Sequence, residues 1–310
     1  MLKLDGLASF VVVAEAGSIS EAARRLGLSK SVVSERLAEV ERTLGAPLLH
    51  RTTRKLSLTE DGAAFLERAA RIVREVEEAT ADMAQRRGTL SGPLRVSAPV
   101  TFGRMHLGPA LYPFLAQHPE LELTLELDDR RVDAAADSFD AVVRHGALQD
   151  SRLVAWELAP SRRLLVAAPA YLERHGTPGS PQELQRHRGI FYVNRGAADW
   201  RLEGSQGVQV VRAGVGLRVN NGDVMRDAAV AGMGIALLPT FIAGDAIRSG
   251  ALRVIDVGLR AAAESIYVAH PEGRRTSAKL RAFVQCLQKT FGTPPYWEAL
   301  IPPCGAGGEG

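Results

Sequence analysis

The N-terminal part of the chain carries a pattern of apolar and helix-capping residues that constrains the fold more than any other segment. Apolar residues at helical spacing predict a first helix over about 2–16. Ser18 and Glu21 form a capping box, which starts a second, short helix over about 19–26. Gly27 suits the left-handed conformation that often follows a helix end. The segment therefore predicts two helices followed by a tight turn.

A third helix follows at once, because Ser29 can cap it and an apolar stripe continues behind it. The stripe consists of Val33, Leu37, Val40 and Leu44. Two short helices joined by a Gly-containing turn form a helix-turn-helix, whose second helix enters the DNA major groove with its N-terminal end. The side chains near that end that can reach bases or phosphates belong to Ser29, Lys30, Ser31, Ser34 and Arg36.

The residues after the third helix predict two short strands around a basic turn. Such a wing can hold backbone phosphates through Arg51, Arg54 and Lys55. Residues 1–57 carry nine Lys or Arg against six Asp or Glu, which makes this the most basic part of the chain per residue. The pattern alone also fits a small helical domain with a solvated basic loop, so both interpretations stay open at this point.

Length and composition describe an ordinary globular protein. The 310 residues fit two domains, and 46% hydrophobic with 24% charged residues excludes general disorder. No apolar run is long enough for a transmembrane helix, and the N-terminus lacks the pattern of a secretory signal peptide. Cys286 and Cys304 form no CxxC motif, which excludes a disulfide framework and a cysteine zinc site. We therefore expect a cytoplasmic protein without a membrane partner.

Thr59 can cap a long amphipathic helix over about 60–87, which would span roughly 40 Å. Its apolar stripe consists of Ala63, Leu66, Ala70, Val73, Val76 and Met83. A single helix of this length needs a partner for that stripe. We expect the same helix of a second subunit, and packing against the chain's own C-terminal domain is the alternative. The run Gly88–Pro93 breaks the helix and indicates a hinge.

Helical and strand segments alternate through the rest of the chain, which predicts an α/β domain with mostly parallel pairing. Strict alternation over Leu121–Leu127 indicates one strand, and Ala141–Arg144 and Leu164–Ala167 indicate short buried strands. In such sheets small ligands bind beyond the carboxyl ends of the strands or between subdomains. A ligand pocket is therefore expected in this domain.

The N-terminal motifs closely resemble those of the LysR-type transcriptional regulators. The matching runs, in order, are Phe10–Ala23, Leu26–Ser34, Leu44–Arg51 and Leu58–Gly62. Lys30 and Leu49 stand where that family often has Gln and Phe. The resemblance implies an α/β protein with an N-terminal winged helix-turn-helix, a linker helix and a C-terminal domain similar to periplasmic solute-binding proteins. The implied parts are 1–59 for DNA binding, 60–88 for dimerisation, 89–92 as hinge, 93–293 for effector binding and 294–310 as a flexible tail.

The resemblance also implies an effector cleft between two subdomains of the C-terminal domain. Subdomain I would comprise about 93–161 and 268–293, and subdomain II about 162–267. The expected contacts, with Asp223 as a further one, are Ser97, Pro99, Val100, Thr101, Arg144, His145, Gly146, Asn194, Asn221 and Gly222. The amides near Thr101 would start a helix suited to an anion, and Arg144 with His145 suggests a carboxylate.

The resemblance implies double-stranded DNA, a small effector and a second copy of the chain as partners. The copies would form a homodimer and then a dimer of dimers, and RNA polymerase is a further partner that it allows. The alternatives to a regulator are a solute-binding module and an α/β enzyme. The seven histidines show no HExxH spacing and the chain has no G-x-S-x-G, so neither metal nor nucleophile chemistry is expected. We expect no enzyme activity and no cofactor.

Overall fold

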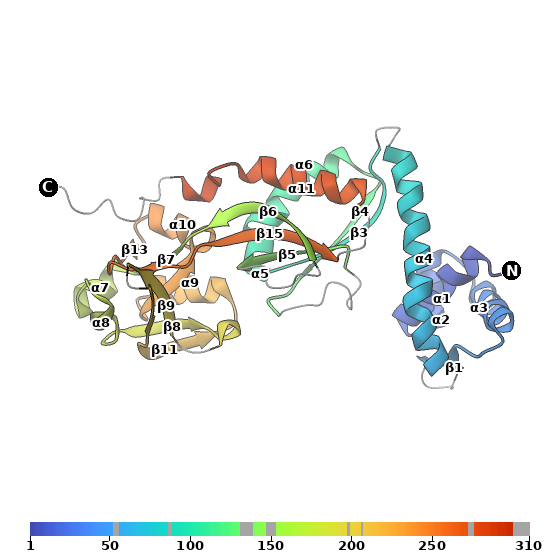
Figure 1. The fold of residues 1–310 in the computed structure, drawn as a ribbon, viewed down its shortest axis with the longest axis horizontal. Helices are drawn as coiled ribbons and strands as arrows, with labels where there is room; N and C mark the ends of the chain where they lie inside the picture. Colours follow the sequence, from blue (N-terminus) through green and yellow to red (C-terminus); the bar gives the residue numbers. More distant parts are fainter. Residues whose placement is uncertain are drawn as a thin grey trace. The chain divides into compact units, whose positions relative to one another are not determined.

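The computed structural model describes residues 1–51, 56–85, 89–130, 139–146, 153–196, 199–205, 207–271 and 276–299. The chain divides into two compact units, Met1–Thr89 and Leu90–Gly310 (Figure 1). None of the helices within the described ranges combines the length and the apolar character that crossing a bilayer requires.

The N-terminal unit is a winged helix-turn-helix that continues into a long helix. Its elements are α1 (Leu4–Ala16), α2 (Ile19–Leu26), α3 (Lys30–Leu44), β1 (Leu49–Arg51), β2 (Leu56–Leu58) and α4 (Glu60–Gln85). The predicted caps are confirmed, because the hydroxyls of Ser18, Ser29 and Thr59 each accept a backbone N–H from the first turn of the following helix. Gly27 has φ 64°, the left-handed conformation expected between α2 and α3.

The core of this unit uses most of the predicted apolar stripes. Val33, Leu37 and Val40 of α3 are buried, whereas Leu44 in the last turn is 39% exposed because it extends past the core. The first half of α4 packs on α1, with Ala69 and Ala70 buried there. The α4 stripe thus has a partner within its own domain, which neither sequence interpretation had included.

The second unit contains two five-stranded sheets and one three-stranded sheet. Their strand orders are β4-β3-β5-β15-β6, β11-β8-β12-β7-β13 and β10-β9-β14. The strands are β3 (Gly92–Ala98), β4 (Leu121–Leu127), β5 (Ala141–Gly146), β6 (Leu153–Ser161), β7 (Arg163–Ala167), β8 (Arg188–Tyr192), β9 (Trp200–Gly204), β10 (Gly207–Val211), β11 (Gly214–Val219), β12 (Ile235–Pro239), β13 (Arg253–Val254), β14 (Arg260–Ala261) and β15 (Glu264–Pro271).

Helices pack along these sheets. They are α5 (Val100–Phe102), η1 (Gly103–Leu107), α6 (Gly108–Gln117), α7 (Pro169–His175), α8 (Pro181–Leu184), η2 (Val193–Arg195), α9 (Gly222–Val230), α10 (Thr240–Arg248), α11 (Ala278–Phe291) and η3 (Tyr296–Glu298). Figure 1 shows α6 and α11 side by side along the sheet that contains β5, β15 and β6, and residues of both helices belong to its core.

The sheets are mixed, so the expectation of mostly parallel pairing was wrong. Pairing is parallel between β3 and β4, which α6 connects, and between β8 and its neighbours β11 and β12. It is antiparallel where β15 joins β5 and β6 and where β7 joins β12 and β13. The chain passes without a helix from β6 to β7, between the two five-stranded sheets, and from β14 to β15, which helix–strand alternation does not reveal.

The chain passes into and back out of the half that contains β7–β14 at two adjacent places, and the return starts from β14 of the three-stranded sheet. One crossing lies between Ser161 and Arg163, and the other lies between Ala261 and Glu264. Because Glu264 is the register partner of Ser161, the two crossings lie next to each other. Strand β15 therefore begins ahead of position 268, where the sequence placed the return to subdomain I.

The start of the expected flexible tail is folded. Trp297 in η3 is only 3% exposed, and its ring lies 5.2 Å from that of Phe291 and 6.1 Å from that of Phe102. The expectation of a flexible tail is therefore wrong for 294–299. Residues 300–310, including Cys304, lie outside the described part.

Candidate functional site

The N-terminal end of α3 presents small donors to solvent. Ser29, Lys30 and Ser31 are exposed and Ser34 is half-buried. The Ser29 hydroxyl accepts the backbone N–H of Val32 at 3.3 Å and lies 2.8 Å from the Ser31 hydroxyl. No ion pair joins Lys30 to any residue that the structure describes, so its ammonium group remains available to a partner.

Arg36 lies apart from this group. Its guanidinium contacts Asp5 Oδ2 at 3.1 Å and Ser9 Oγ at 3.5 Å, which fastens α3 to α1. The predicted wing is present, with Leu49 opposite Leu58 in an antiparallel pair. The side chain of Arg51 and the whole of Arg54 and Lys55 lie outside the described part.

A pocket of about 930 Å³ lies in the C-terminal unit and is lined from both five-stranded sheets. Seven of the ten predicted effector residues line it: Pro99, Thr101, Arg144, His145, Gly146, Asn194 and Gly222. The volume lies in the range of pockets that hold small organic molecules. The structure therefore brings residues from the two predicted lobes to one cavity.

The other three predicted residues support the walls instead. Ser97 is fully buried and accepts a hydrogen bond from Arg144 at 3.2 Å. The backbone N–H of Val100 donates to Asp129 Oδ1 at 3.0 Å, so the chain's own carboxylate occupies the amide that was expected to meet an anion. Asn221 caps α9 by accepting the N–H of Val224 at 3.1 Å.

The first turns of α5 and α9, which come from different lobes, meet at Thr101 and Asp223. Thr101 Oγ1 donates to Asp223 Oδ2 at 3.2 Å, and Arg104 and Arg226 also pair with this carboxylate. A Cβ atom at Gly222 would lie 3.1 Å from Thr101 Oγ1 and 2.6 Å from the end of the Ile242 side chain. Glycine at this position therefore permits the close approach of the two helices.

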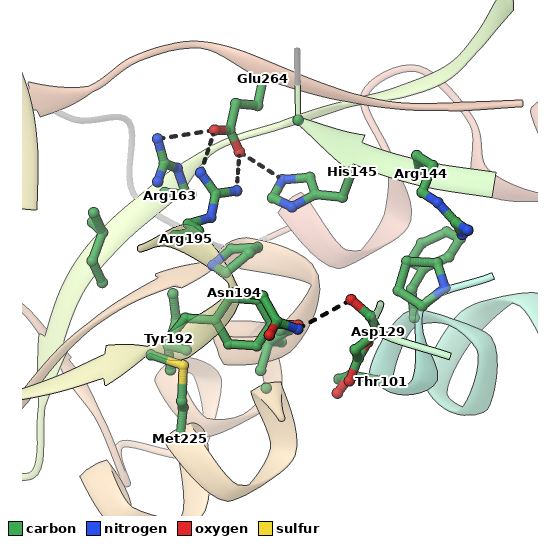
Figure 2. Close-up of a pocket in the computed structure, with 18 of the residues that line it drawn as sticks. Thr101, Asp129, Arg144, His145, Arg163, Tyr192, Asn194, Arg195, Met225 and Glu264 are labelled. Atoms are coloured by element: carbon green, nitrogen blue, oxygen red, sulfur yellow. Dashed lines mark hydrogen bonds and ion pairs between the residues drawn. The ribbon is translucent and has the colours of Figure 1, made fainter. Parts of the chain in front are cut away.

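A charge cluster around the buried Glu264 forms one end of the pocket, and of its members only His145 was predicted from the sequence. Arg195 donates to both oxygens of Glu264, at 2.7 and 2.8 Å, and Arg163 lies 3.0 Å away (Figure 2). His145 Nε2 is 3.1 Å from the same carboxylate. The Glu264 side chain is 9% exposed. These residues come from four separate segments, so no local sequence signal announces the cluster.

Burial decides the charges in this cluster. It lowers the pKa of His145 to about 4 although Glu264 is close, so the imidazole is neutral near pH 7. Burial acts to raise the pKa of Glu264, but the hydrogen bonds from Arg195 and the charges of Arg195 and Arg163 together outweigh it and hold that pKa below its ordinary value. The cluster therefore consists of one carboxylate, two guanidinium groups and a neutral imidazole.

Arg144 lies across the pocket from the Glu264 cluster (Figure 2). Its guanidinium donates to the backbone oxygen of Val143 at 2.7 Å and to Ser97 Oγ. No described carboxylate forms an ion pair with it, and burial lowers its pKa. Nearby, Asn194 Nδ2 donates to the backbone oxygen of Asp129 at 3.1 Å, and burial raises the pKa of the Asp129 carboxyl.

Aromatic rings form much of the remaining wall. The aromatic lining residues are Phe102, Phe191, Tyr192, Trp200, Phe241 and Tyr267. They suit an apolar part of a ligand, because apolar surface and a few placed polar groups are the usual content of such pockets. Within the described residues, no group of three or more His, Cys, Asp or Glu side chains is arranged to hold a metal ion.

Two sequence models of protein families match the chain. Residues 4–63 match "Bacterial regulatory helix-turn-helix protein, lysR family", and residues 87–292 match "LysR substrate binding domain". Together these matches cover both units.

Individual proteins agree with this assignment. The chain is 34% identical over 298 residues to the HTH-type transcriptional repressor PA14_22550 of Pseudomonas aeruginosa, covering 95% of this chain and 94% of the relative. The solved structure of CrgA, a LysR-type transcriptional regulator from Neisseria meningitidis, is 31% identical, with a TM-score of 0.59 over 92% of this chain and 97% of that one. The full-length Vibrio cholerae virulence activator AphB is 26% identical, with a TM-score of 0.57 over 92% and 98%.

Proposed function

Because this chain belongs to the LysR family of bacterial transcriptional regulators, we propose that it reads its DNA site with the start of α3 and answers to a ligand in the pocket of its C-terminal unit. In this proposal residues 1–59 bind DNA, 60–88 mediate dimerisation, 89–92 act as hinge and 93–293 bind the effector. Such a protein works in the cytoplasm, where the DNA is.

One observation carries the DNA-binding part. Ser29, Lys30 and Ser31 are exposed on the first turn of a helix whose opposite face is buried in the domain core. Short hydroxyls and a flexible ammonium group suit base edges and phosphates of the major groove. Ser34 lies one turn further on and joins this reading surface. Arg36 is left out, since Asp5 already binds its guanidinium.

We assign phosphate binding to the wing, through Arg51, Arg54 and Lys55. Basic side chains on a turn between two short strands would add affinity without sequence preference. Binding should therefore weaken steeply as salt rises, because phosphate contacts release counterions.

We assign the pocket to a small-molecule effector that is bound and not turned over. Its walls come from two lobes joined by two adjacent crossings, so a ligand that fits one arrangement of the lobes better shifts the population towards it. The named relatives are transcriptional regulators, which supports a role in control and not catalysis. Conversion of a bound ligand to a product would contradict this assignment.

The proposal includes self-association through α4. Ile72 and Val76 are 41% and 40% exposed and lie four residues apart, so they share one face of that helix. A second α4 would cover them, which supports a homodimer. A dimer of dimers and contact with RNA polymerase at the promoter complete the proposed set of partners.

Gel retardation with the DNA upstream of the chain's own gene tests the proposal. We expect retardation at low salt that weakens steeply as salt rises. Lys30→Ala should weaken binding at least about fivefold. Arg42→Ala removes a positive charge from the exposed last turn of the same helix and serves as the matched control. No retardation, or equal losses in both variants, would contradict the assignment of the α3 start.

A further inference from the structure

The side chains that line the pocket carry one more positive than negative formal charge. Five arginines and four carboxylates line it: Arg130, Arg144, Arg163, Arg195 and Arg201 against Asp128, Asp129, Asp199 and Glu264. His145 is neutral and adds nothing. Among the lining residues that the structure describes, the charges therefore differ by one, and a ligand with one negative charge would balance them.

Two of the five arginines, Arg144 and Arg201, form no ion pair within the described residues, and Arg201 is exposed to solvent whereas Arg144 is partly buried. Arg130 pairs with Asp128 at 2.7 Å, and Arg163 and Arg195 share Glu264. Arg144 has only neutral acceptors, Val143 O and Ser97 Oγ, among the described residues. A guanidinium group carries five N–H donors, so Arg144 keeps donors for a further partner.

Partial burial makes this arrangement costly unless a partner arrives. A guanidinium removed from water loses hydration that only a charged or strongly polar partner replaces. A carboxylate matches it best, because two parallel N–H···O bonds form with one planar group. Arg144 and the aromatic residues line the same cavity, so one molecule can contact both.

At the other end of the pocket, Glu264 disfavours a ligand carboxylate. Arg195 uses two donors on its two oxygens and Arg163 lies within 3.0 Å, so these guanidinium groups already hold their carboxylate. A second negative charge on the ligand would have to compete with a buried carboxylate that Arg195 and Arg163 already bind. The chain thus fills this anion position with its own side chain.

We propose that the effector of this protein is an organic molecule with a single carboxylate and an apolar body, that Arg144 binds the carboxylate, and that Glu264 rejects a second one. This inference rests on the proposed function only in naming the ligand an effector. The pocket volume of about 930 Å³ accommodates a ring or a branched chain beside the carboxylate.

Binding of matched probes to the full-length protein tests the proposal. The probes are phenylacetate, cyclohexanecarboxylate and hexanoate, each compared by calorimetry with its neutral primary amide and with the amine of similar size. We expect at least one carboxylate to bind about tenfold or more tighter than its amide, as a charged hydrogen-bond pair should. If no carboxylate binds, or if an amide or amine binds as well as its carboxylate, the proposal is wrong.

Arg144→Gln and Glu264→Gln assign the roles of the charges, and Arg218→Gln and Arg144→Lys serve as comparisons. Arg144→Gln should lose the preference for carboxylate over amide, whereas Arg218→Gln removes the same charge outside the lining and should keep it. Glu264→Gln frees the arginine pair, so phenylsuccinate should gain on phenylacetate about tenfold or more. Arg144→Lys, which keeps the charge, separates loss of recognition from loss of folding. An unchanged preference in Arg144→Gln, or no gain for the dicarboxylate in Glu264→Gln, would overturn the assigned role.

The outcome for DNA is measured separately. Gel retardation without any probe reports on the proposed function alone. If the protein binds carboxylates but retards no DNA, the proposed regulatory function is wrong and the proposed ligand class is supported. If the protein retards DNA but prefers amides, the proposed ligand class is wrong and the proposed regulatory function is supported.

Discussion

His145 illustrates how burial decides what a single side chain can do. In solution an imidazole gains charge within the physiological pH range. Here the low pKa of about 4 keeps the ring neutral beside Glu264, so it shapes the pocket without contributing charge. The residue was predicted to line the pocket from the sequence, but its charge state depends on partners that the sequence does not place.

This low pKa predicts that acid destabilises the C-terminal unit. The unfolded chain binds the proton near the ordinary value of 6.5 and the folded chain only near 4, so between them the unfolded state holds more protons. Lowering the pH from 7 to 5 should then reduce the free energy of unfolding through His145 by about 2 kcal/mol. Urea unfolding at both pH values, in the wild type and in His145→Gln, measures it. The advantage of the wild type over the variant should shrink at pH 5, and an unchanged advantage would contradict the low pKa.

Local chemistry at single residues was readable from the sequence, whereas long-range pairing was not. Ser18, Ser29 and Thr59 cap their helices as predicted, since each cap involves residues only three positions apart. Arg36 was expected at DNA because it follows a helix start, but its partner is Asp5 on another helix. Glu264 escaped notice because its partners come from three other segments.

At the scale of elements, η3 packs behind Phe102, one of the residues that line the pocket. Trp297 packs on Phe102, which lines the pocket, and Glu298 pairs with Arg162 at the first crossing between the sheets. Glu298 also accepts a hydrogen bond from Thr240 at the start of α10. The composition of the C-terminal segment does not predict that η3 packs on the domain, because a single buried tryptophan is enough to anchor it.

Removing that anchor should cost much stability. Trp297→Ala deletes a ring that is 3% exposed, so we expect the free energy of unfolding of the C-terminal unit to fall by about 3–5 kcal/mol. Tyr112→Ala removes a ring that is 68% exposed and should change it by about 0.5 kcal/mol or less. Denaturant titration of both variants measures the difference. Equal effects would show that η3 does not pack as described.

The exposed face of α4 predicts the effect of a change at one helix. Replacing Ile72 and Val76 together by Ser removes apolar surface that a second α4 would bury, so self-association should weaken at least about tenfold. Sedimentation across a range of concentrations measures the dimer constant. Glu75→Ser alters an exposed residue of the same turn and should leave it unchanged. A double variant that associates like the wild type would place the interface elsewhere.

At the scale of the molecule, sequence pattern predicted the order of the parts better than the topology of the sheets. Alternating helix and strand signals located the α/β unit, and seven of the ten named residues meet at its pocket. The direct strand crossings at Arg162 and before Glu264 made the sheets mixed, because no helix separates those strands. The periodicity of apolar residues predicts which face of a strand is buried, but it does not predict whether the neighbouring strand runs parallel or antiparallel to it.

The central claim is that the start of α3 reads base sequence. Equilibrium competition between the upstream DNA and a scrambled fragment of equal length, for the wild type and Ser34→Ala, tests it most directly. We predict that the wild type prefers the upstream fragment by about a thousandfold or more, and that Ser34→Ala lowers this ratio while its affinity for the scrambled fragment stays the same. A wild-type protein that binds both fragments equally would contradict the claim.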